Sequence, residues 1–258
     1  MSMESMESHP RPVPVQQHTD QVQGLFTAIA SRYDLINDVQ SLGLHRLWKR
    51  RVVDLASVSP GDRALDVCCG TGDIAWELAG RGAQVVGLDL CGPMLAIAER
   101  RLDHKVRSSR SRPAGYALPQ FSLGDATALP FPDDSFEVVT AGYGLRNLAD
   151  WRQGLCQMQR VARPGGRLVV LDFGRPRNPV WRAIYMAHLR LVVPVLGLAF
   201  CGKLRAYAYI SRSLRHYPAQ QGLEQAMQEI GLQEVSTVNL FGGAMSITRA
   251  VKTCRPSQ

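Results

Sequence analysis

The sequence predicts an α/β fold with one mostly parallel, seven-stranded sheet that is covered by helices on both faces. Short apolar runs alternate with segments that carry apolar residues at helical spacing, as in repeated strand–helix units. Glycine- or proline-containing turns separate many of these runs, for example at 163–166. The last two apolar runs predict a closing pair of strands, so seven strands are expected in total.

Each expected element follows from its own pattern. The strands are apolar or alternating runs at 64–69, 83–90, 120–123, 137–141, 167–173, 235–240 and 244–251. The helices are segments with apolar residues three and four apart at 21–30, 44–56, 73–81, 93–102, 150–161 and 220–230. A longer apolar stretch at 179–202 is expected to be a helix interrupted by Pro194.

Length and composition suit one domain. The chain has 258 residues with 45% hydrophobic content, enough for a sizeable core. Residues 1–20 are polar and are expected to form a disordered lead-in to a domain over 21–258. An Arg/Ser-rich piece at 104–113 is expected to be an exposed insertion.

The net charge and the cysteine pattern limit the partners and the cellular compartment that the sequence predicts. The net charge of +8 indicates either an anionic partner or simple solubility, and both interpretations stay open. The six cysteines form no CxxC pair, so no metal site is expected, and the pattern fits a reducing, cytoplasmic compartment. The sequence contains no secretory signal pattern and no apolar run of the length that a membrane span needs.

The clearest motif is the stretch DVCCGTGD at 66–73, which follows an expected strand and opens an expected helix. Gly70 and Gly72 allow a sharp turn and a close approach to a ligand. Asp89 ends the next strand, where an acid can hold both hydroxyls of a ribose. The same glycines with Ala75 match the dinucleotide fingerprint, so an NAD-dependent oxidoreductase is an alternative from this motif alone.

Two features favour S-adenosylmethionine over NAD. Asp66 and Asp73 flank the turn with negative charge, which would repel a pyrophosphate but suits the cationic methionine end of S-adenosylmethionine. Asp125 follows the third strand, where it can accept a hydrogen bond from an adenine amino group. Strand ends converge at one edge of such a sheet. The predicted cofactor-binding residues are Asp66, Gly70, Thr71, Gly72, Asp89, Asp125, Ala126 and Gly142.

With these motifs the chain resembles the class I S-adenosylmethionine-dependent methyltransferases, which have a Rossmann-like sheet. Narrower motifs, FTAIASRYDLIN at 26–37, SLGLHRLWK at 41–49 and GLRN at 144–147, resemble the ubiquinone/menaquinone C-methyltransferase family. The resemblance spans roughly 21–251. It implies a helical lid at 21–58 over the cofactor and a cap at 174–219 that faces the substrate or a membrane.

The resemblance also implies the substrate, a prenylated quinol that is methylated on a ring carbon. The segments LDFGRP at 171–176 and YAYISRSL at 207–214 resemble the phylloquinone branch and favour a naphthoquinol, so the predicted reaction converts demethylmenaquinol to menaquinol. Arg205, where that branch has an acid, departs from the pattern. A phylloquinone precursor, a ubiquinone precursor and a non-catalytic quinone-binding role remain alternatives.

Arg146 and Asn147 are the predicted catalytic residues. Carbon methylation needs an electron-rich ring, and Arg146 can stabilise charge on a quinol oxygen. Asn147 can orient a hydroxyl or a water, and proton transfer through water is the expected route, since arginine is a poor base. His45 is either a general base or a buried histidine with a hydrogen-bond partner. Trp48 is expected in the core.

The stretch at 181–200 mixes apolar and basic residues. It allows interfacial docking on an anionic membrane, while an ordinary packed cap helix is the alternative. A nucleic-acid partner is not expected, because an Asn-Pro-Pro-Tyr motif of amino-methylating enzymes is missing. The sequence leaves a homodimer open.

Overall fold

The computed structural model describes residues 15–41, 43–108, 117–195, 198, 213, 214 and 217–253. Its centre is a seven-stranded sheet in the order β3-β2-β1-β4-β5-β7-β6, in which β7 runs opposite to the other six strands. The predicted sheet and its strand number are confirmed. The strands are β1 (Arg63–Val67), β2 (Gln84–Asp89), β3 (Gln120–Leu123), β4 (Phe136–Gly142), β5 (Ala162–Phe173), β6 (Leu232–Leu240) and β7 (Met245–Lys252).

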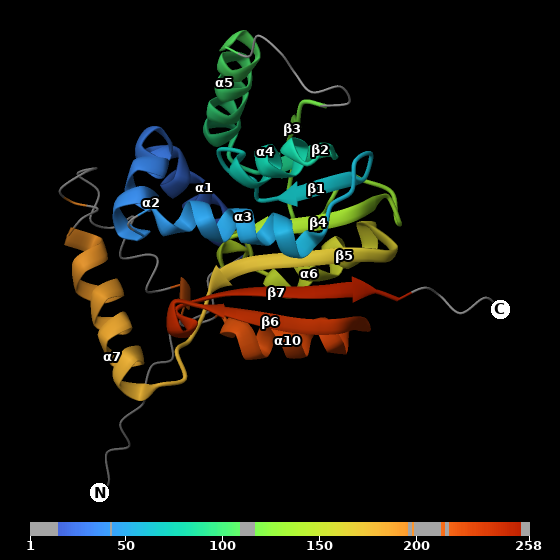
Figure 1. Ribbon diagram of the computed structural model, residues 1–258. Helices are drawn as coiled ribbons and strands as arrows, with labels where there is room; N and C mark the ends of the chain where they lie inside the picture. Colours follow the sequence, from blue (N-terminus) through green and yellow to red (C-terminus); the bar gives the residue numbers. More distant parts are fainter. Residues whose placement is uncertain are drawn as a thin grey trace, which may run out of the picture.

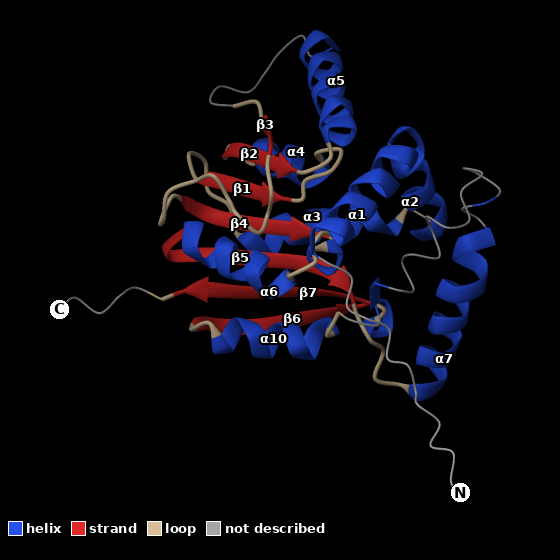
Figure 2. Ribbon diagram, turned by 180° about the vertical axis from the view of Figure 1, so that it is seen from behind, coloured by secondary structure: helices blue, strands red, loops and turns tan. Residues whose placement is uncertain are grey.

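Helices cover both faces of this sheet, as the sequence predicts. α3 (Leu44–Ala56) and α4 (Asp73–Gly80) pack on one face, and α5 (Gly92–Ser108) lies against β2 and β3. α6 (Trp151–Val161) and α10 (Ala219–Glu229) cover the other face, which Figure 2 shows in front. The sheet is therefore the middle layer of three, and apolar side chains fill the space on each side of it.

A further group of helices lies at the carboxyl ends of the parallel strands. It consists of α1 (Val15–Ile29), the 3₁₀ turn η1 (Ala30–Arg32), α2 (Tyr33–Ser41) and α7 (Pro179–Ala187) with the π-helical segment η3 (His188–Val192). Ile29 and Ile36 pack against Tyr185 and Leu189 in a separate apolar cluster. Figure 1 shows α7 standing outside the three layers, on the side of α2.

The structure corrects two predicted boundaries in the first half of the chain. α1 begins at Val15, so residues 15–20 are helical, not part of a disordered lead-in. Gln23 Nε2 donates to the Leu90 carbonyl (3.1 Å), which fixes α1 to the sheet edge. Residues 104–108 continue α5, whereas 109–116 lie outside the described residues.

The predicted lid at 21–58 divides into two parts. α1 and α2 lie over the strand ends, and α2 is a helix that the periodicity did not predict. α3 belongs to the core layer, because Val52, Val53 and Ala56 are buried against the sheet. The lid in the structure is therefore shorter than predicted.

Pro194 does not end the helix of the cap. Residues 193–195 are helical, and the five residues before them form the π-helical segment, in which the Val193 N–H donates to the His188 carbonyl. A proline lacks an N–H and clashes with the carbonyl four residues earlier, and a wider π turn relieves that conflict. Within the described part of the chain, no helix has the length and apolarity to cross a bilayer.

Candidate active site

The glycine-rich turn joins β1 to α4, and both predicted glycines have left-handed backbones. Gly70 has φ of 57° and Gly72 has φ of 84°, a region that residues with a Cβ rarely adopt. A Cβ on Gly72 would lie 2.7 Å from the ring of Phe121. Gly72 thus packs against Phe121, and it shapes the turn without lining any of the cavities described below.

A cleft of about 140 Å³ lies between the strand ends and α1. The structure brings five of the predicted cofactor residues together in its walls: Gly70, Asp89, Asp125, Ala126 and Gly142. Asn147, predicted as catalytic, lies in the same walls. Residues of α1 close the opposite side, a contribution that the polar sequence of this helix did not reveal.

Asp89 has the geometry that a ribose needs. Its Oδ2 accepts from the Gly70 N–H and its Oδ1 from the Cys91 N–H, both at 2.8 Å. A carboxylate accepts about four hydrogen bonds, so each oxygen can still take a hydroxyl. Burial raises the pKa of Asp89, although these backbone N–H groups favour the charged form. The residues present therefore fit the diol of a nucleoside.

Asp125 and Thr127 form a tight turn after β3. The Thr127 N–H donates to Asp125 Oδ1 at 2.8 Å, and this contact fixes the carboxylate in the wall of the cleft. The position agrees with a site for an adenine amino group.

A smaller cavity, of about 20 Å³, continues from the cleft beneath the glycine-rich turn. Asp66, Gly70, Thr71 and Gly142 line it together with Lys49. Asp66 is buried and accepts from Thr140 Oγ1 (2.8 Å) and from the Ala75 N–H (3.1 Å). Burial raises its pKa to about 7 against these hydrogen bonds, so Asp66 is not a fixed negative charge.

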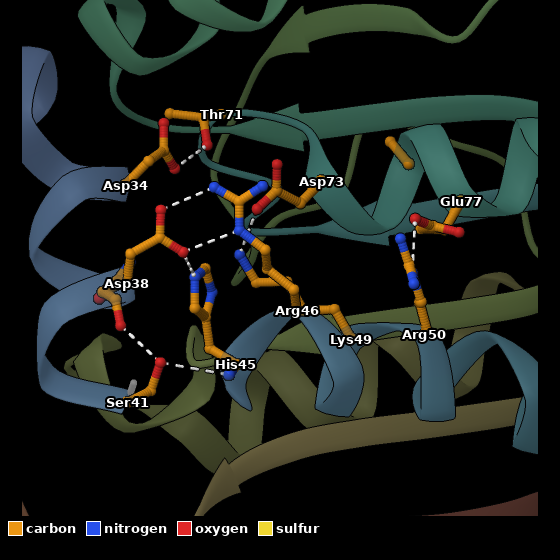
Figure 3. A network of polar contacts seen from close by, with 12 residues as sticks. Asp34, Asp38, Ser41, His45, Arg46, Lys49, Arg50, Thr71, Asp73 and Glu77 are labelled. Carbon is orange, nitrogen blue, oxygen red and sulfur yellow. Dashed lines mark hydrogen bonds and ion pairs between the residues drawn. The ribbon is translucent and has the colours of Figure 1, made fainter. Parts of the chain in front are cut away.

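Asp73 is neutralised by two cations, as Figure 3 shows in part. Lys49 Nζ contacts Asp73 Oδ2 at 2.6 Å, and Arg101 contacts Asp73 Oδ1 at 3.0 Å. Arg101 also pairs with Asp34, whose Oδ1 accepts from Thr71 Oγ1 at 2.9 Å. The predicted repulsion of a pyrophosphate by Asp66 and Asp73 is therefore weaker than the sequence suggests, because burial raises the pKa of Asp66 and two cations pair with Asp73.

Lys49 is a site residue that the sequence analysis missed. It is buried, yet Asp73, Tyr33 and Asp34 together outweigh the effect of burial and hold its pKa above the usual value. A charged ammonium thus lines the small cavity next to the glycine-rich turn. Lys49 is the last residue of the motif at 41–49, and this position was the only signal of it in the sequence.

A third cavity, of about 610 Å³, lies on the other side of the lid and is mostly apolar. Residues of α1, α2, α3, α7 and η3 and of the ends of β5 and β7 line its walls, including Phe26, Trp48, Phe173, Ile184 and Leu189. Trp48 is partly buried and packs against the core as well. Tyr33 and Tyr143 line all three cavities, so these two side chains stand where the apolar cavity meets the cofactor side.

Arg146 lines the apolar cavity and is held by several groups at once. Its Nε lies 3.2 Å from Asp172 Oδ1, and its guanidinium lies 4.8 Å from the centre of the Phe173 ring. Its Nη1 donates to Asn147 Oδ1 (2.9 Å) and to Ser213 Oγ (3.0 Å). Burial raises the pKa of Asp172 to about 6, and the nearby Arg146 acts in the opposite direction.

Asn147 lies just after β4, as predicted, and its side-chain amide contacts other groups of the protein. Its Oδ1 accepts from Arg146, and its Nδ2 donates to the Tyr143 carbonyl at 2.9 Å. Both ends of the amide are thus bound to the protein. Tyr143 has φ of 61°, an uncommon backbone for a residue with a side chain, and Asn147 helps to hold it.

His45 has features of a buried histidine with a hydrogen-bond partner and also of a general base, the two roles predicted for it. Its Nε2 lies 2.8 Å from Asp38 Oδ1, and the ring is buried, as expected for a partnered core histidine. The ring also lines the apolar cavity, and among the described residues Nδ1 has no hydrogen-bond partner. Burial lowers the pKa of His45 despite Asp38, which favours a neutral ring that can accept a proton.

Comparison with known families gives these cavities a context. The model of the ubiE/COQ5 methyltransferase family matches residues 15–252, nearly the whole chain. The chain belongs to this family. It is an S-adenosylmethionine-dependent methyltransferase, which confirms the predicted family, fold and cofactor and decides against NAD.

Individual relatives agree with this assignment. The chain is 38% identical over 244 residues to the ubiquinone/menaquinone biosynthesis C-methyltransferase UbiE of Ectopseudomonas mendocina, covering 93% of this chain and 92% of that protein. It is 39% identical over 233 residues to the demethylmenaquinone methyltransferase of Renibacterium salmoninarum, covering 90% and 92%.

Solved structures show the same fold at low identity. A methyltransferase from Thermotoga maritima has a TM-score of 0.60 at 18% identity, over 90% of this chain and 100% of that chain. A second one, from Aquifex aeolicus, has a TM-score of 0.58 at 13% identity, over 85% and 98%. Both are described as dependent on S-adenosylmethionine.

Proposed function

We propose that this enzyme methylates a ring carbon of a prenylated naphthoquinol, converting demethylmenaquinol to menaquinol. The names of its relatives support a quinone substrate. The observation that carries the proposal is the apolar cavity of about 610 Å³, which meets the cofactor side at Tyr33 and Tyr143. An apolar cavity of this size suits a bicyclic ring and the first part of a prenyl chain.

The residues that line the cleft and the small cavity provide partners for the adenosine and the methionine parts of the cofactor. We assign Asp125 and Ala126 to the adenine, and Asp89 to the ribose. Gly70 and Gly142 permit the close approach of the backbone, and Asp66, Thr71 and Gly72 shape the turn. Lys49 supports this orientation, because its ammonium lies where the carboxylate of the methionine end would need a counter-charge.

When bound, S-adenosylmethionine supplies a methyl group on a positively charged sulfur. The protein must then align the ring carbon with that methyl group and keep the quinol oxygen electron-rich. We assign this charge stabilisation to Arg146, the cation that lines the apolar cavity and is fixed by Asp172. As the new carbon–carbon bond forms, the ring carbon gives up its proton to water or to a neutral base.

Asn147 and Tyr143 complete the arrangement as positioning residues. Asn147 connects Arg146 with the backbone of Tyr143 and so couples the charged group to the junction of the cavities. We assign His45 as the group that takes a proton on the apolar side, since it lines the cavity, Asp38 partners its Nε2, and burial lowers its pKa towards the neutral form. Tyr33 and Tyr143 exclude water where the two reactants meet.

A substrate panel under reducing conditions tests the proposal. Purified enzyme is incubated with S-adenosylmethionine and one of three quinols: demethylmenaquinol, a phytyl naphthoquinol or a prenylated benzoquinol. We expect the highest kcat/KM with demethylmenaquinol. If either of the other two quinols gives a higher kcat/KM, that quinol replaces demethylmenaquinol as the assigned substrate. No product with any of the three would refute quinol methylation.

A further inference from the structure

The net charge of the protein comes from one segment. Residues 174–223 hold eight of the 30 basic residues and none of the 22 acidic ones. The rest of the chain therefore has 22 basic and 22 acidic residues and is balanced. A segment that carries the whole excess of positive charge is suited to an anionic partner, whereas a soluble surface needs no such concentration.

The described part of this segment, α7 with η3 and the turn that follows, is apolar on two opposite sides. Tyr185, Leu189 and Val193 are spaced four residues apart and are buried against the lid. The opposite side faces outward and carries Val180, Ile184, Leu191, Val195 and Leu198, which are between 52% and 67% exposed. A helix that is apolar all round is normally covered on all sides.

The outward side continues into the mouth of the apolar cavity. Ile184 and Val192 line the cavity and are also largely exposed, at 55% and 44%. Phe241, on the 3₁₀ turn η4 (Phe241–Gly243), is 57% exposed, packs edge-on against Trp181 and lines the cavity with it. The exposed apolar surface and the cavity rim are therefore one continuous feature.

Arginines flank this surface without counter-ions. Arg175, Arg177 and Arg190 are exposed and Arg182 is half-buried, and none of the four forms an ion pair with another described residue. Figures 1 and 2 both show α7 projecting from the body of the protein. Cations beside exposed apolar side chains match the headgroups and acyl chains of an anionic lipid surface.

We propose that α7, η3 and Phe241 dock onto an anionic lipid bilayer, so that the mouth of the apolar cavity opens directly at the membrane. Only the reason for docking rests on the proposed function: a prenylated quinol resides in the bilayer and would enter the cavity from there. The docking itself follows from charge, exposure and continuity with the cavity.

Vesicle sedimentation of the full-length enzyme tests the docking. One set of vesicles is pure phosphatidylcholine, and the other contains about a third phosphatidylglycerol, a strongly anionic composition. We expect binding to the anionic vesicles that weakens as salt is added, and at least tenfold weaker binding to the neutral ones. No binding to the anionic vesicles at low salt would overturn the proposal.

Variants on the outward side identify the surface. Leu191→Glu and Val195→Glu change exposed residues that do not line the cavity. Each should lower vesicle binding about tenfold, because an aliphatic side chain that would insert into the bilayer is lost. The combined variant Arg182→Gln/Arg190→Gln should lower binding to anionic vesicles by about fivefold per arginine. The matched control is Leu123→Glu on β3, which is 64% exposed and lies outside the segment. Equal binding by wild type and the two glutamate variants would contradict the proposal.

Two further measurements separate the alternatives. Turnover of a short-chain demethylmenaquinol in detergent should be unchanged in Leu191→Glu and Val195→Glu, while turnover of a long-chain quinol in vesicles should fall with binding. If wild type binds vesicles but methylates no quinol in detergent, the proposed function fails and the docking stands. Dimers in analytical ultracentrifugation that Leu191→Glu dissociates would show instead that a second copy covers this face.

Discussion

The two sides of the active site are built in opposite ways. On the cofactor side, polar groups from the ends of β1, β2, β3 and β4 converge on a cleft, and hydrogen bonds within the protein fix each acid. On the substrate side, helices from two distant parts of the chain enclose a mostly apolar cavity. Arg146, Tyr33 and Tyr143 lie at the boundary.

This difference separates recognition by hydrogen bonds from recognition by shape. A cleft of fixed donors and acceptors selects one cofactor, because an unpaired buried polar group is costly. An apolar cavity discriminates weakly between hydrophobic chains, since each methylene contributes little. We therefore expect strict cofactor specificity and tolerance of different prenyl lengths, with Arg146 selecting the quinol ring.

The largest effect should follow from the boundary residue Arg146. Arg146→Gln removes the charge next to the quinol oxygen, and turnover should fall by about 100- to 1000-fold, while S-adenosylmethionine affinity in calorimetry stays close to wild type. The variant also leaves Asp172 buried without its cation, which costs about 3 to 5 kcal/mol of stability.

The double variant Arg146→Gln/Asp172→Asn separates chemistry from stability. It removes both charges of the buried pair, so much of the stability should return while turnover remains low. Recovery of turnover in the double variant would move Arg146 to a structural role. The same conclusion would follow if the single variant lost cofactor affinity and turnover equally.

On the cofactor side, Asp89→Ala should have the next largest effect. It removes a carboxylate that would accept two ribose hydroxyls, and S-adenosylmethionine should bind at least about 100-fold more weakly, because hydrogen bonds to charged groups contribute about 1.5 to 3 kcal/mol each. Isothermal calorimetry measures the affinity, and circular dichroism checks the fold. Asp133→Ala, an exposed acid outside the three cavities, is the control. Unchanged affinity in Asp89→Ala would contradict the ribose assignment.

On the same side, the raised pKa of Asp66 predicts how the stability of the folded protein depends on pH. Burial raises its pKa from 3.8 to about 7 in the folded protein. The folded state therefore keeps a proton that the unfolded state releases, and stability is full below 3.8 and declines as the pH rises towards 7. In Asp66→Asn this decline should become shallower by on the order of 1 kcal/mol per pH unit. Urea unfolding across this range measures it, and an unchanged slope would show that Asp66 is ionised in the folded protein.

The smallest effect concerns the contact between the lid and the glycine-rich turn. Thr71→Val removes the hydrogen bond to Asp34 in α2, and cofactor affinity should fall about fivefold, since one such bond contributes about 1 kcal/mol. Thr71→Ser keeps the hydroxyl and should bind like wild type. If both variants bind like wild type, the lid does not depend on this contact.

The two sides also differ in how far the sequence predicted them. Gly70, Asp89 and Asp125 follow strands whose ends must meet at one edge of a parallel sheet, so their convergence could be predicted from strand order alone. The charge state of Asp66 and Asp73 could not be predicted. Lys49 and Arg101, which pair with Asp73, come from other helices, and the burial that shifts the pKa of Asp66 exists only in the packed structure.

The substrate side was predicted mainly by resemblance. Arg146 was identified in its motif, but its partner Asp172 lies 26 residues away on β5, and no local pattern links the two. The lid boundary failed for a similar reason: residues 15–20 are helical and α1 contacts the end of β2 through Gln23, whereas the periodicity of the apolar residues begins only at Val22. Tertiary contacts, which a local sequence pattern does not show, determine both the Arg146–Asp172 pairing and the extent of α1.

The central claim, that a quinol is methylated where the two sides meet, is tested most directly in cells. Quinones are extracted from a strain that lacks this protein and analysed by mass spectrometry, with wild type and Arg146→Gln reintroduced separately. We predict accumulation of a quinone lighter by one methylene, its disappearance with wild type and its persistence with Arg146→Gln. An unchanged quinone profile in the strain lacking the protein would contradict the account.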